Sequence, residues 1–400
     1  MRAVTRPLSD HTDEPVDLND VAGGDGLLFV RNAVGAAGRG VAARVPVDDA
    51  ARFLADLDVD STVPGRGPIA FGCIPFVPGA SADLVVPSVQ LRKDGDGSTS
   101  LTLVGEVGDE QVAEALRPRE PAPAKVASWS IEPAVGMTAY LDAVAAARDA
   151  VRAGELTKAV IARPIVVTSS APIDVHAVLR RLRASFGSSY RYSIEGFIGA
   201  SPELLVEVDG PVVRSHPLAG TAPRTGDADN DARLADALIA STKDQIEHRV
   251  VIDVVHDTLL PWASYLDWEP EPSIVTVANV QHLGTRMEGR LSQPGPSVIE
   301  LVRALSPTPA LGGHPRDEAI DLIRRVEGFE RGRYGGAVGW VDADGNGTWA
   351  VAIRCAELSD DRRSARLVAG GGIVADSDPH AELAETQAKF QAMLSAIVRP

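Results

Sequence analysis

Near its C-terminus the sequence reads Leu367-Val-Ala-Gly-Gly-Gly-Ile-Val-Ala-Asp-Ser-Asp-Pro-His-Ala-Glu-Leu-Ala-Glu-Thr-Gln-Ala-Lys389. A short apolar run, typical of a strand, leads into three glycines, and a helix start follows. Asp378 suits the N-cap of that helix, and Pro379 suits its first position. Glycines let a ligand approach the backbone closely because they have no side chain. The segment therefore predicts a strand, an accessible backbone and a capped helix.

The predicted helix carries a charged stripe. Glu382, Glu385 and Lys389 fall at positions i, i+3 and i+7, so they share one face. A pair of carboxylates suits Mg²⁺, which prefers hard oxygen ligands. Acidic pairs with this spacing are also common on solvated helix faces, and the segment alone does not separate the two interpretations.

The composition is that of an ordinary globular protein of 400 residues, with 44% hydrophobic and 24% charged residues. A formal net charge of −16 argues against nucleic-acid binding, which needs a basic face. An anionic ligand would therefore need cations close by. No apolar run resembles a signal peptide or a membrane span, and Cys73 and Cys355 lack metal-ligand spacing. We expect a cytoplasmic protein without disulfides.

The proline-rich stretch Arg117–Lys125 is the best candidate boundary in the chain. We predict an N-terminal portion, residues 1–125, that contributes strands to the same fold as a catalytic region of residues 126–400. Strand-like runs punctuated by glycine and proline begin at Gly26. The polar residues before them predict disorder at the very start of the chain.

Beyond this stretch, helical and strand patterns alternate. Residues 137–153 and 175–186 have helical periodicity, and residues 158–167 are typical of a strand. A long helix is predicted from about residue 230 to 260, with Glu247 beside its apolar stripe. The stripe comprises Leu234, Leu238, Ile246, Val250 and Val254. A carboxylate at the edge of a buried face needs a partner, which is either a structural cation or a metal or substrate.

Arg354 is predicted to lie on the second strand of a hairpin whose turn spans Asp342–Gly347. In that register it shares a face with Ala350 and Ala352, whose small side chains leave room for a ligand. The alternative is an ordinary ion-pair or edge residue.

Seven segments occur in the order in which the chorismate-utilising enzymes carry them. They are Lys158-Ala-Val-Ile-Ala-Arg163, Phe197-Ile-Gly-Ala-Ser-Pro-Glu203, Pro217-Leu-Ala-Gly-Thr221, Lys243-Asp-Gln-Ile-Glu-His248, Val280-Gln-His-Leu283, Pro307-Thr-Pro-Ala-Leu-Gly-Gly313 and Gly370-Gly-Gly-Ile-Val-Ala-Asp-Ser377. The sequence therefore resembles this family, which includes anthranilate, aminodeoxychorismate, salicylate and isochorismate synthases. The resemblance covers residues 130–400, and Phe71–Phe76 extends it weakly toward the N-terminus.

Two features narrow the resemblance to the isochorismate synthases. Ala219 stands where aminodeoxychorismate synthases carry a nucleophilic lysine, so the incoming group must be an external molecule, which is water in the isochorismate type. The segment 307–313 also looks like that of isochorismate synthases. We expect no amidotransferase domain, because water chemistry needs no ammonia channel. The resemblance thus implies chorismate as substrate, and no amidotransferase, nucleic-acid or membrane partner is expected.

The family mechanism implies two catalytic residues. Lys158 matches the general base that activates water for attack at C2 of the chorismate ring, so it must be neutral when it acts. Glu203 matches the general acid that protonates the departing C4 hydroxyl, and we therefore expect its pKa to be raised. The product would be isochorismate.

The resemblance also implies the binding residues. Glu247, Glu382 and Glu385 match carboxylates that gather Mg²⁺ against a substrate carboxylate, and this metal would invert the local charge. The positions that match the rest of the substrate pocket are Gly220, Thr221, His282, Ala310, Leu311, Tyr334, Arg354, Gly370, Gly371, Gly372 and Lys389. His282 matches a histidine that assists pyruvate loss in some relatives, and here we assign it a pocket role only.

The implied fold is the α+β chorismate-binding architecture of anthranilate synthase component I, with large antiparallel-rich sheets packed face to face and helices outside. We expect a Mg²⁺-dependent isochorismate synthase, and a monomer. The alternatives are a salicylate synthase, which also expels pyruvate, and a non-catalytic chorismate-binding subunit. The sequence does not separate menaquinone from siderophore biosynthesis.

Overall fold

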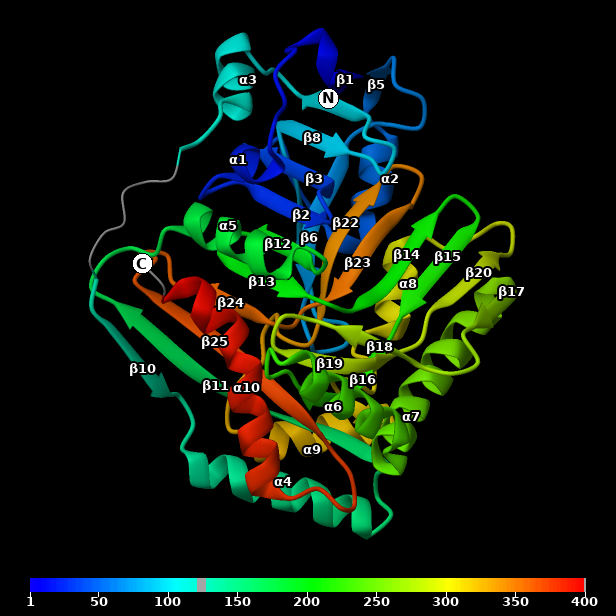
Figure 1. Ribbon diagram of the computed structural model, residues 1–400. Helices are drawn as coiled ribbons and strands as arrows, with labels where there is room; N and C mark the ends of the chain where they lie inside the picture. Colours follow the sequence, from blue (N-terminus) through cyan, green and yellow to red (C-terminus); the bar gives the residue numbers. More distant parts are fainter. Residues whose placement is uncertain (121–126, 399–400) are drawn as a thin grey trace.

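The computed structural model describes residues 1–120 and 127–398. Two large sheets pack face to face, and most of the helices lie outside them (Figure 1). The first sheet has thirteen strands, and all but one of its pairings are antiparallel. Its order is β10 (Trp129–Pro133), β11 (Lys158–Ser169), β25 (Ser364–Ile373), β24 (Cys355–Leu358), β13 (Phe197–Ser201), β12 (Tyr190–Ile194), β2 (Leu27–Arg31), β3 (Val34–Arg39), β8 (Val89–Lys93), β9 (Thr99–Val104), β1 (Arg2–Pro7) and β5 (Asp58–Ser61), with β21 (Gly313–His314) beside β11.

The second sheet has nine strands, and a third, smaller sheet has three. The order of the second is β17 (Ala263–Trp268), β20 (Met287–Leu291), β15 (Val212–His216), β14 (Leu204–Asp209), β23 (Gly347–Val351), β22 (Ala337–Asp342), β6 (Ile69–Ile74), β7 (Asp83–Val86) and β4 (Ala43–Pro46). The order of the third is β16 (Leu218–Pro223), β19 (Val280–Gly284) and β18 (Ser273–Thr276).

Ten α-helices complete the described part of the chain. They are α1 (Leu18–Ala22), α2 (Ala50–Ala55), α3 (Asp109–Leu116), α4 (Met137–Arg152), α5 (Val175–Phe186), α6 (Ala228–Ala240), α7 (Thr242–Leu259), α8 (Val298–Leu305), α9 (Arg316–Val326) and α10 (Pro379–Ile397). Helix α10 runs along β25, and α4 lies beside β11 (Figure 1). No helix in the described ranges is long and apolar enough to cross a membrane.

The interior between the two large sheets holds the main core. Its largest apolar cluster contains Tyr192 and Phe197 from the first sheet and Val338 and Trp349 from the second. The strands that carry these side chains are buried on both faces, since every residue of β12 and β13 and nearly every residue of β22 is buried. The predicted arrangement of large antiparallel-rich sheets face to face is confirmed.

The N-terminal portion supplies strands to both large sheets. Strands β2, β3, β8, β9, β1 and β5 extend the first sheet, and β6, β7 and β4 extend the second. The predicted disorder at the start of the chain is wrong, because residues 2–7 form β1, which pairs with both β5 and β9. The predicted linker 117–125 lies partly outside the described residues, from 121 onward.

Several predicted elements are confirmed, but the long helix over 230–260 is wrong. Helices α4 and α5 and strand β11 occupy the expected ranges within a few residues. The long helix is instead α6 and α7, because the hydroxyl of Ser241 accepts a hydrogen bond from the Asp244 amide and starts a new helix. The break shifts the helical phase, so Ile246 is 57% exposed while Val251, Val255 and other residues form the buried face.

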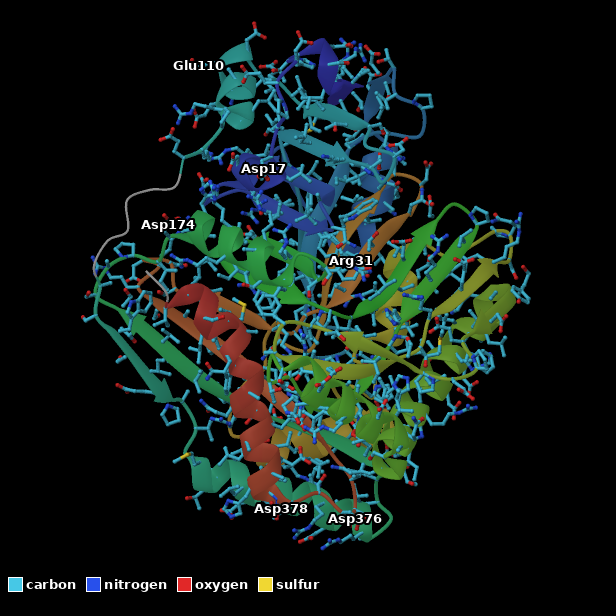
Figure 2. All side chains as sticks on the ribbon, in the orientation of Figure 1. Asp17, Arg31, Glu110, Asp174, Asp376 and Asp378 are labelled. Atoms are coloured by element: carbon cyan, nitrogen blue, oxygen red, sulfur yellow. The ribbon has the colours of Figure 1, made fainter. Side chains whose placement is uncertain are left out.

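The capped helix at the C-terminus is confirmed. The Asp378 carboxylate accepts a hydrogen bond from the Ala381 amide at 2.9 Å, and Pro379 is the first residue of α10. Figure 2 shows Asp378 at that end of the helix. Gly370–Gly372 belong to β25 itself, where they pair with Ala162, Ile161 and Val160 of β11. The glycines are therefore strand residues, and the turn follows them.

Candidate active site

One pocket gathers nearly all the residues that the sequence singles out. It lies beside the start of β11, the glycines of β25 and the first turns of α7 and α10. Fifteen of the sixteen predicted site residues line it. They are Lys158, Glu203, Gly220, Thr221, Glu247, His282, Ala310, Leu311, Tyr334, Arg354, Gly370, Gly372, Glu382, Glu385 and Lys389.

Lys158 is the most deeply placed cation of the pocket. It begins β11, and its side chain is only 1% exposed. Its Nζ donates a hydrogen bond to Oε1 of Glu247, from the second turn of α7, at 2.8 Å. The Lys158 ammonium and neighbouring lysines keep the pKa of Glu247 low despite the opposing effect of burial. The two groups therefore form a charged pair.

Glu203 lies where the chain passes from one large sheet to the other. Only Pro202 and Glu203 separate β13 of the first sheet from β14 of the second. The carboxyl is 3% exposed, and its Oε1 accepts a weak hydrogen bond of 3.4 Å from the Leu218 amide. Burial raises its pKa to about 8, and the Leu218 hydrogen bond and Lys158 oppose this only in part. Glu203 is thus a carboxylic acid that keeps its proton at neutral pH, as expected.

Arg354 lies at the opposite crossing between the sheets. The prediction that it belongs to a strand is wrong: β23 ends at Val351, and the backbone at Arg354 is left-handed with φ of 52°. Its carbonyl is anchored by the Ala200 amide at 3.0 Å. Burial lowers the pKa of the Arg354 guanidinium to about 10, so it remains charged at neutral pH. The bend brings Arg354 into the pocket by a different route from the one predicted.

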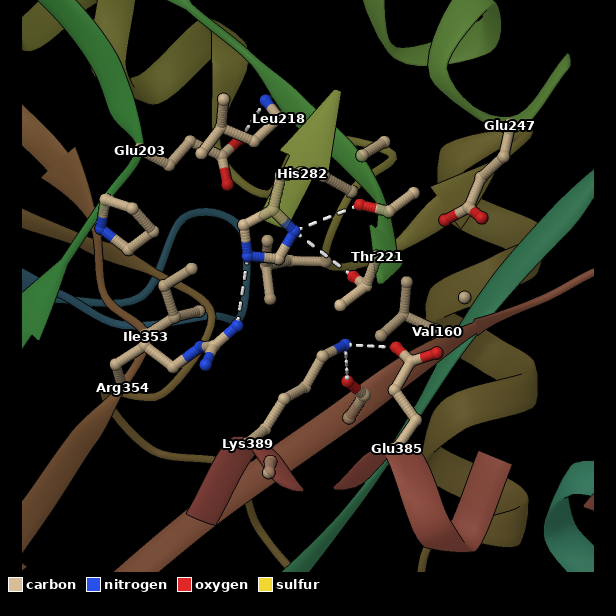
Figure 3. Close-up of a pocket in the computed structure, with 18 of the residues that line it drawn as sticks. Val160, Glu203, Leu218, Thr221, Glu247, His282, Ile353, Arg354, Glu385 and Lys389 are labelled. Carbon is tan, nitrogen blue, oxygen red and sulfur yellow. Dashed lines mark hydrogen bonds and ion pairs between the residues drawn. The ribbon is translucent and has the colours of Figure 1, made fainter. Parts of the chain in front are cut away.

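His282 connects Arg354 to β16, as Figure 3 shows. Its Nε2 lies 3.1 Å from Nη2 of Arg354, which can only donate, so Nε2 accepts. The other nitrogen, Nδ1, therefore carries the proton and donates to the Gly220 carbonyl at 3.0 Å. Burial, with Arg354 and Lys389, lowers the pKa of His282 to about 3. His282 is thus neutral, and the Thr221 hydroxyl, 3.1 Å from Nδ1, keeps its own proton for a ligand.

Gly220 makes this arrangement possible. Its φ is 71°, and a bulge separates Ala219 from Thr221 in the pairing of β16 with β19. A side chain at Gly220 would lie 3.1 Å from Cβ of Asp244 on α7. Glycine therefore allows the strand to bend at this position, and the bend directs the Gly220 carbonyl toward His282.

The acidic stripe of α10 lines the pocket, with Glu382 buried and Glu385 partly exposed. Glu382 is 4% exposed, and its Oε1 accepts a hydrogen bond from the Ser377 hydroxyl at 2.9 Å. Its Oε2 is buried without a hydrogen-bond partner. Burial and the neighbouring Glu385 raise the pKa of Glu382 to about 7. Lys389 donates to the Gly370 carbonyl at 2.8 Å and lies 2.5 Å from Glu385 (Figure 3).

Comparison with known proteins agrees with this geometry. Residues 50–398 match the family described as chorismate binding enzyme. The chain belongs to the chorismate-binding enzymes. Among the relatives of this chorismate-binding enzyme, isochorismate synthase DhbC of Bacillus subtilis is 37% identical over 341 residues, which are 82% of this chain and 81% of the relative.

Solved structures of chorismate-binding enzymes have the same architecture. The menaquinone-specific isochorismate synthase MenF of Escherichia coli superposes with a TM-score of 0.82 at 26% identity, over 99% of this chain and 94% of that one. Anthranilate synthase component I of Streptococcus pneumoniae superposes with a TM-score of 0.73 at 23% identity, over 98% and 92%, which shows the fold alone. The predicted fold class is confirmed.

The glycines at the end of β25 let carboxylates lie against the strand. A side chain at Gly372 would come within 2.4 Å of Oε1 of Glu247. Gly371 is the one predicted residue that does not line the pocket, because it faces α10, where a side chain would meet Oε2 of Glu382 at 2.6 Å. The main effect of these glycines is thus to leave space for the carboxylates of Glu247 and Glu382 beside the strand.

The three carboxylates are oxygen ligands of the type that a hard metal ion such as Mg²⁺ prefers. The buried, unpartnered Oε2 of Glu382 is an oxygen ligand without a donor, as a metal site would need. In the described part of the chain, however, no three acidic, histidine or cysteine side chains are gathered closely enough to hold a metal. Lysines instead lie against Glu247, Glu382 and Glu385.

Sequence reasoning missed several residues of the pocket. They are Val160, Pro202, Leu218, Lys243, Asp244, Ile353, Val368 and Ala369, and Ala219 also lines the wall. Lys243 carried a usable signal, because it stands four residues before Glu247 and so shares its helix face. The apolar members carried none, since their position depends on how the sheets cross.

Proposed function

We propose that this chorismate-binding enzyme is an isochorismate synthase, which converts chorismate to isochorismate. The observation that carries the proposal is a buried amine, Lys158, and a protonated buried acid, Glu203, on the walls of one pocket. Ala219 also lines that pocket, at the position where aminodeoxychorismate synthases carry a nucleophilic lysine, so we assign the attack to water. The isochorismate synthases among its relatives support the same reaction.

Glu203 would supply the proton that the leaving group needs. Loss of a hydroxyl from C4 of the ring requires an acid that is still protonated at neutral pH, and a buried carboxyl is such an acid. Its proton leaves with the hydroxyl as water. Among the described residues the carboxyl accepts one weak hydrogen bond, from the Leu218 amide, and this contact together with Lys158 offsets the effect of burial only in part.

Lys158 would take a proton from the water that attacks C2. One water molecule enters and one leaves, so the reaction is balanced as an isomerisation. The hydrogen bond to Glu247 would hold the amine in place, and Lys158 has to be neutral when it acts as the base. Burial of Lys158 keeps other water away from the amine, which limits competing reactions.

The remaining cations and polar groups would bind the two substrate carboxylates. Arg354, fixed by His282, and Lys389, fixed by Gly370, present fixed positive charges to one of them. Thr221 has a free hydroxyl proton for the ring or its hydroxyls. In an acidic protein, this local concentration of cations is what allows a dianion to bind.

Mg²⁺ is part of the proposal. Glu247, Glu382 and Glu385 are the residues that would hold it, and the ion would supply positive charge for a substrate carboxylate. The unpartnered oxygen of Glu382 supports this assignment. Removal of the metal with a chelator should therefore weaken chorismate binding.

The product tests the proposal. Pure protein incubated with chorismate and Mg²⁺ should yield isochorismate, followed by chromatography and by ultraviolet absorbance. Salicylate fluorescence together with pyruvate release, with no lyase added, would instead identify a salicylate synthase. Chorismate that binds but stays unchanged would identify a non-catalytic subunit.

The pH dependence of the reaction should show the Glu203 acid. With a pKa of about 8, its protonated fraction decreases above pH 8, so kcat/KM should fall about tenfold per pH unit there. The folded state also holds this proton between pH 4.5 and about 8 where the unfolded chain has lost it, so Glu203 lowers stability as the pH rises through that range. A rate that already declines from pH 5 would contradict the assignment.

A further inference from the structure

The pocket holds an unusual share of the lysines of the chain. The sequence has 39 lysine and arginine residues, but only five are lysines. Three of these five, Lys158, Lys243 and Lys389, line this one pocket. Nearly all the other basic residues of the chain are arginines, so the presence of three lysines in this pocket needs a physical reason.

The reason is the difference in shape between the charged groups of lysine and arginine. A guanidinium is a broad planar fork, whereas an ammonium is a compact and strongly hydrated point charge. A compact cation can stand beside a carboxylate in a confined space and leave it again, much as a small metal ion does. Each of the three lysines stands beside a different carboxylate that is expected to bind metal, with N–O distances of 2.8 Å to Glu247, 3.7 Å to Glu382 and 2.5 Å to Glu385.

Lys243 is the most weakly held of the three. Lys158 is almost fully buried in its pair, and Lys389 also donates to the Gly370 carbonyl. The Lys243 ammonium lies 3.7 Å from Glu382, beyond hydrogen-bond distance, and its side chain is 44% exposed. It can therefore move into solvent without breaking a hydrogen bond.

Glu382 would remain oriented after such a movement. Its Oε1 keeps the hydrogen bond from Ser377 at 2.9 Å, and its Oε2 is free of any other donor. Without a cation nearby, however, the acidic groups of α7 and α10 would repel one another in a poorly solvated space. Some positive charge is thus needed at this place at all times.

We propose that Lys243 is an exchangeable counter-ion of the metal site. In the metal-free protein its ammonium balances the carboxylates of α7 and α10, and it moves out to solvent when a divalent cation binds Glu247, Glu382 and Glu385. This inference rests on the proposed function, from which it takes the metal site.

Calorimetric titration of Mg²⁺ into substrate-free protein tests the proposal. Lys243→Met removes the competing charge, so Mg²⁺ should bind about tenfold more tightly, because the like charge of the ammonium no longer opposes the metal ion. In metal-free buffer this variant should melt below the wild type, and Mg²⁺ should raise its melting temperature by more. Both readouts are independent of turnover.

Two variants control for charge. Lys243→Arg keeps the charge but replaces the compact ammonium with a planar fork that can hold Glu382 through two hydrogen bonds, so it should bind Mg²⁺ more weakly than the wild type. Arg249→Met removes one positive charge from the same helix, where Arg249 pairs with Asp253 at 2.8 Å and is 60% exposed, and it should leave Mg²⁺ affinity unchanged.

Unchanged or weaker Mg²⁺ binding by Lys243→Met would overturn the proposal, as would an equal gain in Arg249→Met. Absence of Mg²⁺ binding in the wild type would also overturn it. Isochorismate formation is assayed separately on the same preparations. A protein that shows the affinity difference but makes no isochorismate would reject the proposed function and leave the counter-ion role standing.

Discussion

Lys158→Ala should lower kcat by about 10²–10⁴-fold, the range that one proton-transfer group contributes, while chorismate still binds. The amine is the buried base of the proposed reaction, and neither Lys243 nor Lys389 replaces it, because each lies beside another carboxylate. Turnover is measured by chromatography of the product, and chorismate binding is measured by calorimetry.

Folding has to be checked in this variant, because alanine leaves Glu247 without its partner. Lys158→Gln provides the check, since its amide still donates to the Glu247 carboxylate but cannot take a proton from water. It should fold and melt like the wild type and be as inactive as Lys158→Ala. Lys93→Ala, outside the pocket, is the control for loss of a lysine and should keep full activity. An active Lys158→Gln enzyme would reject Lys158 as the base.

Local sequence signals were sufficient to predict elements whose ends are marked by capping residues or prolines. Asp378 and Pro379 fixed the start of α10, and the stripe of Glu382, Glu385 and Lys389 follows from helix geometry alone. Ser241 carried an equally good capping signal, but the apolar spacing across it favoured one continuous helix. The buried face of α7 was consequently assigned to the wrong residues.

Residues whose position depends on where the chain passes from one sheet to the other could not be placed from the spacing of apolar residues in the sequence. Arg354 leaves its strand in a left-handed conformation between the two large sheets, and nothing in its neighbours marks that bend. The same limit applies to the ion pairs. The motifs placed Lys243 and Glu247 in one segment, but the contact of Lys243 with Glu382, from a helix more than a hundred residues away, requires the fold.

Arg331→Met should destabilise the protein by about 3–5 kcal/mol, the usual effect of removing one partner of a buried ion pair. Arg331 and Glu327 are 2% and 1% exposed, and they hold the side of β11 between β21 and β10. Arg331 donates to the carbonyls of Val160 and Leu311 at 2.7 Å each, and Glu327 accepts from the Ala162 amide at 2.7 Å. The pair thus satisfies the backbone groups of β11 where no strand of the described residues pairs with that edge. This stretch begins two residues after Lys158, so its loss should displace Lys158 and lower kcat as well.

Chemical denaturation of a matched set decides whether the pair has this role. Arg366→Met breaks the half-exposed pair with Glu357 at 2.8 Å and should cost at most about 1 kcal/mol. Replacing both partners of an ordinary buried pair with apolar residues is often neutral. Here the double variant Glu327→Leu, Arg331→Met should stay destabilised, because the backbone groups of β11 lose their partners too. Wild-type stability in the double variant would mean that the two charges only neutralise each other and do not support the strand that carries Lys158.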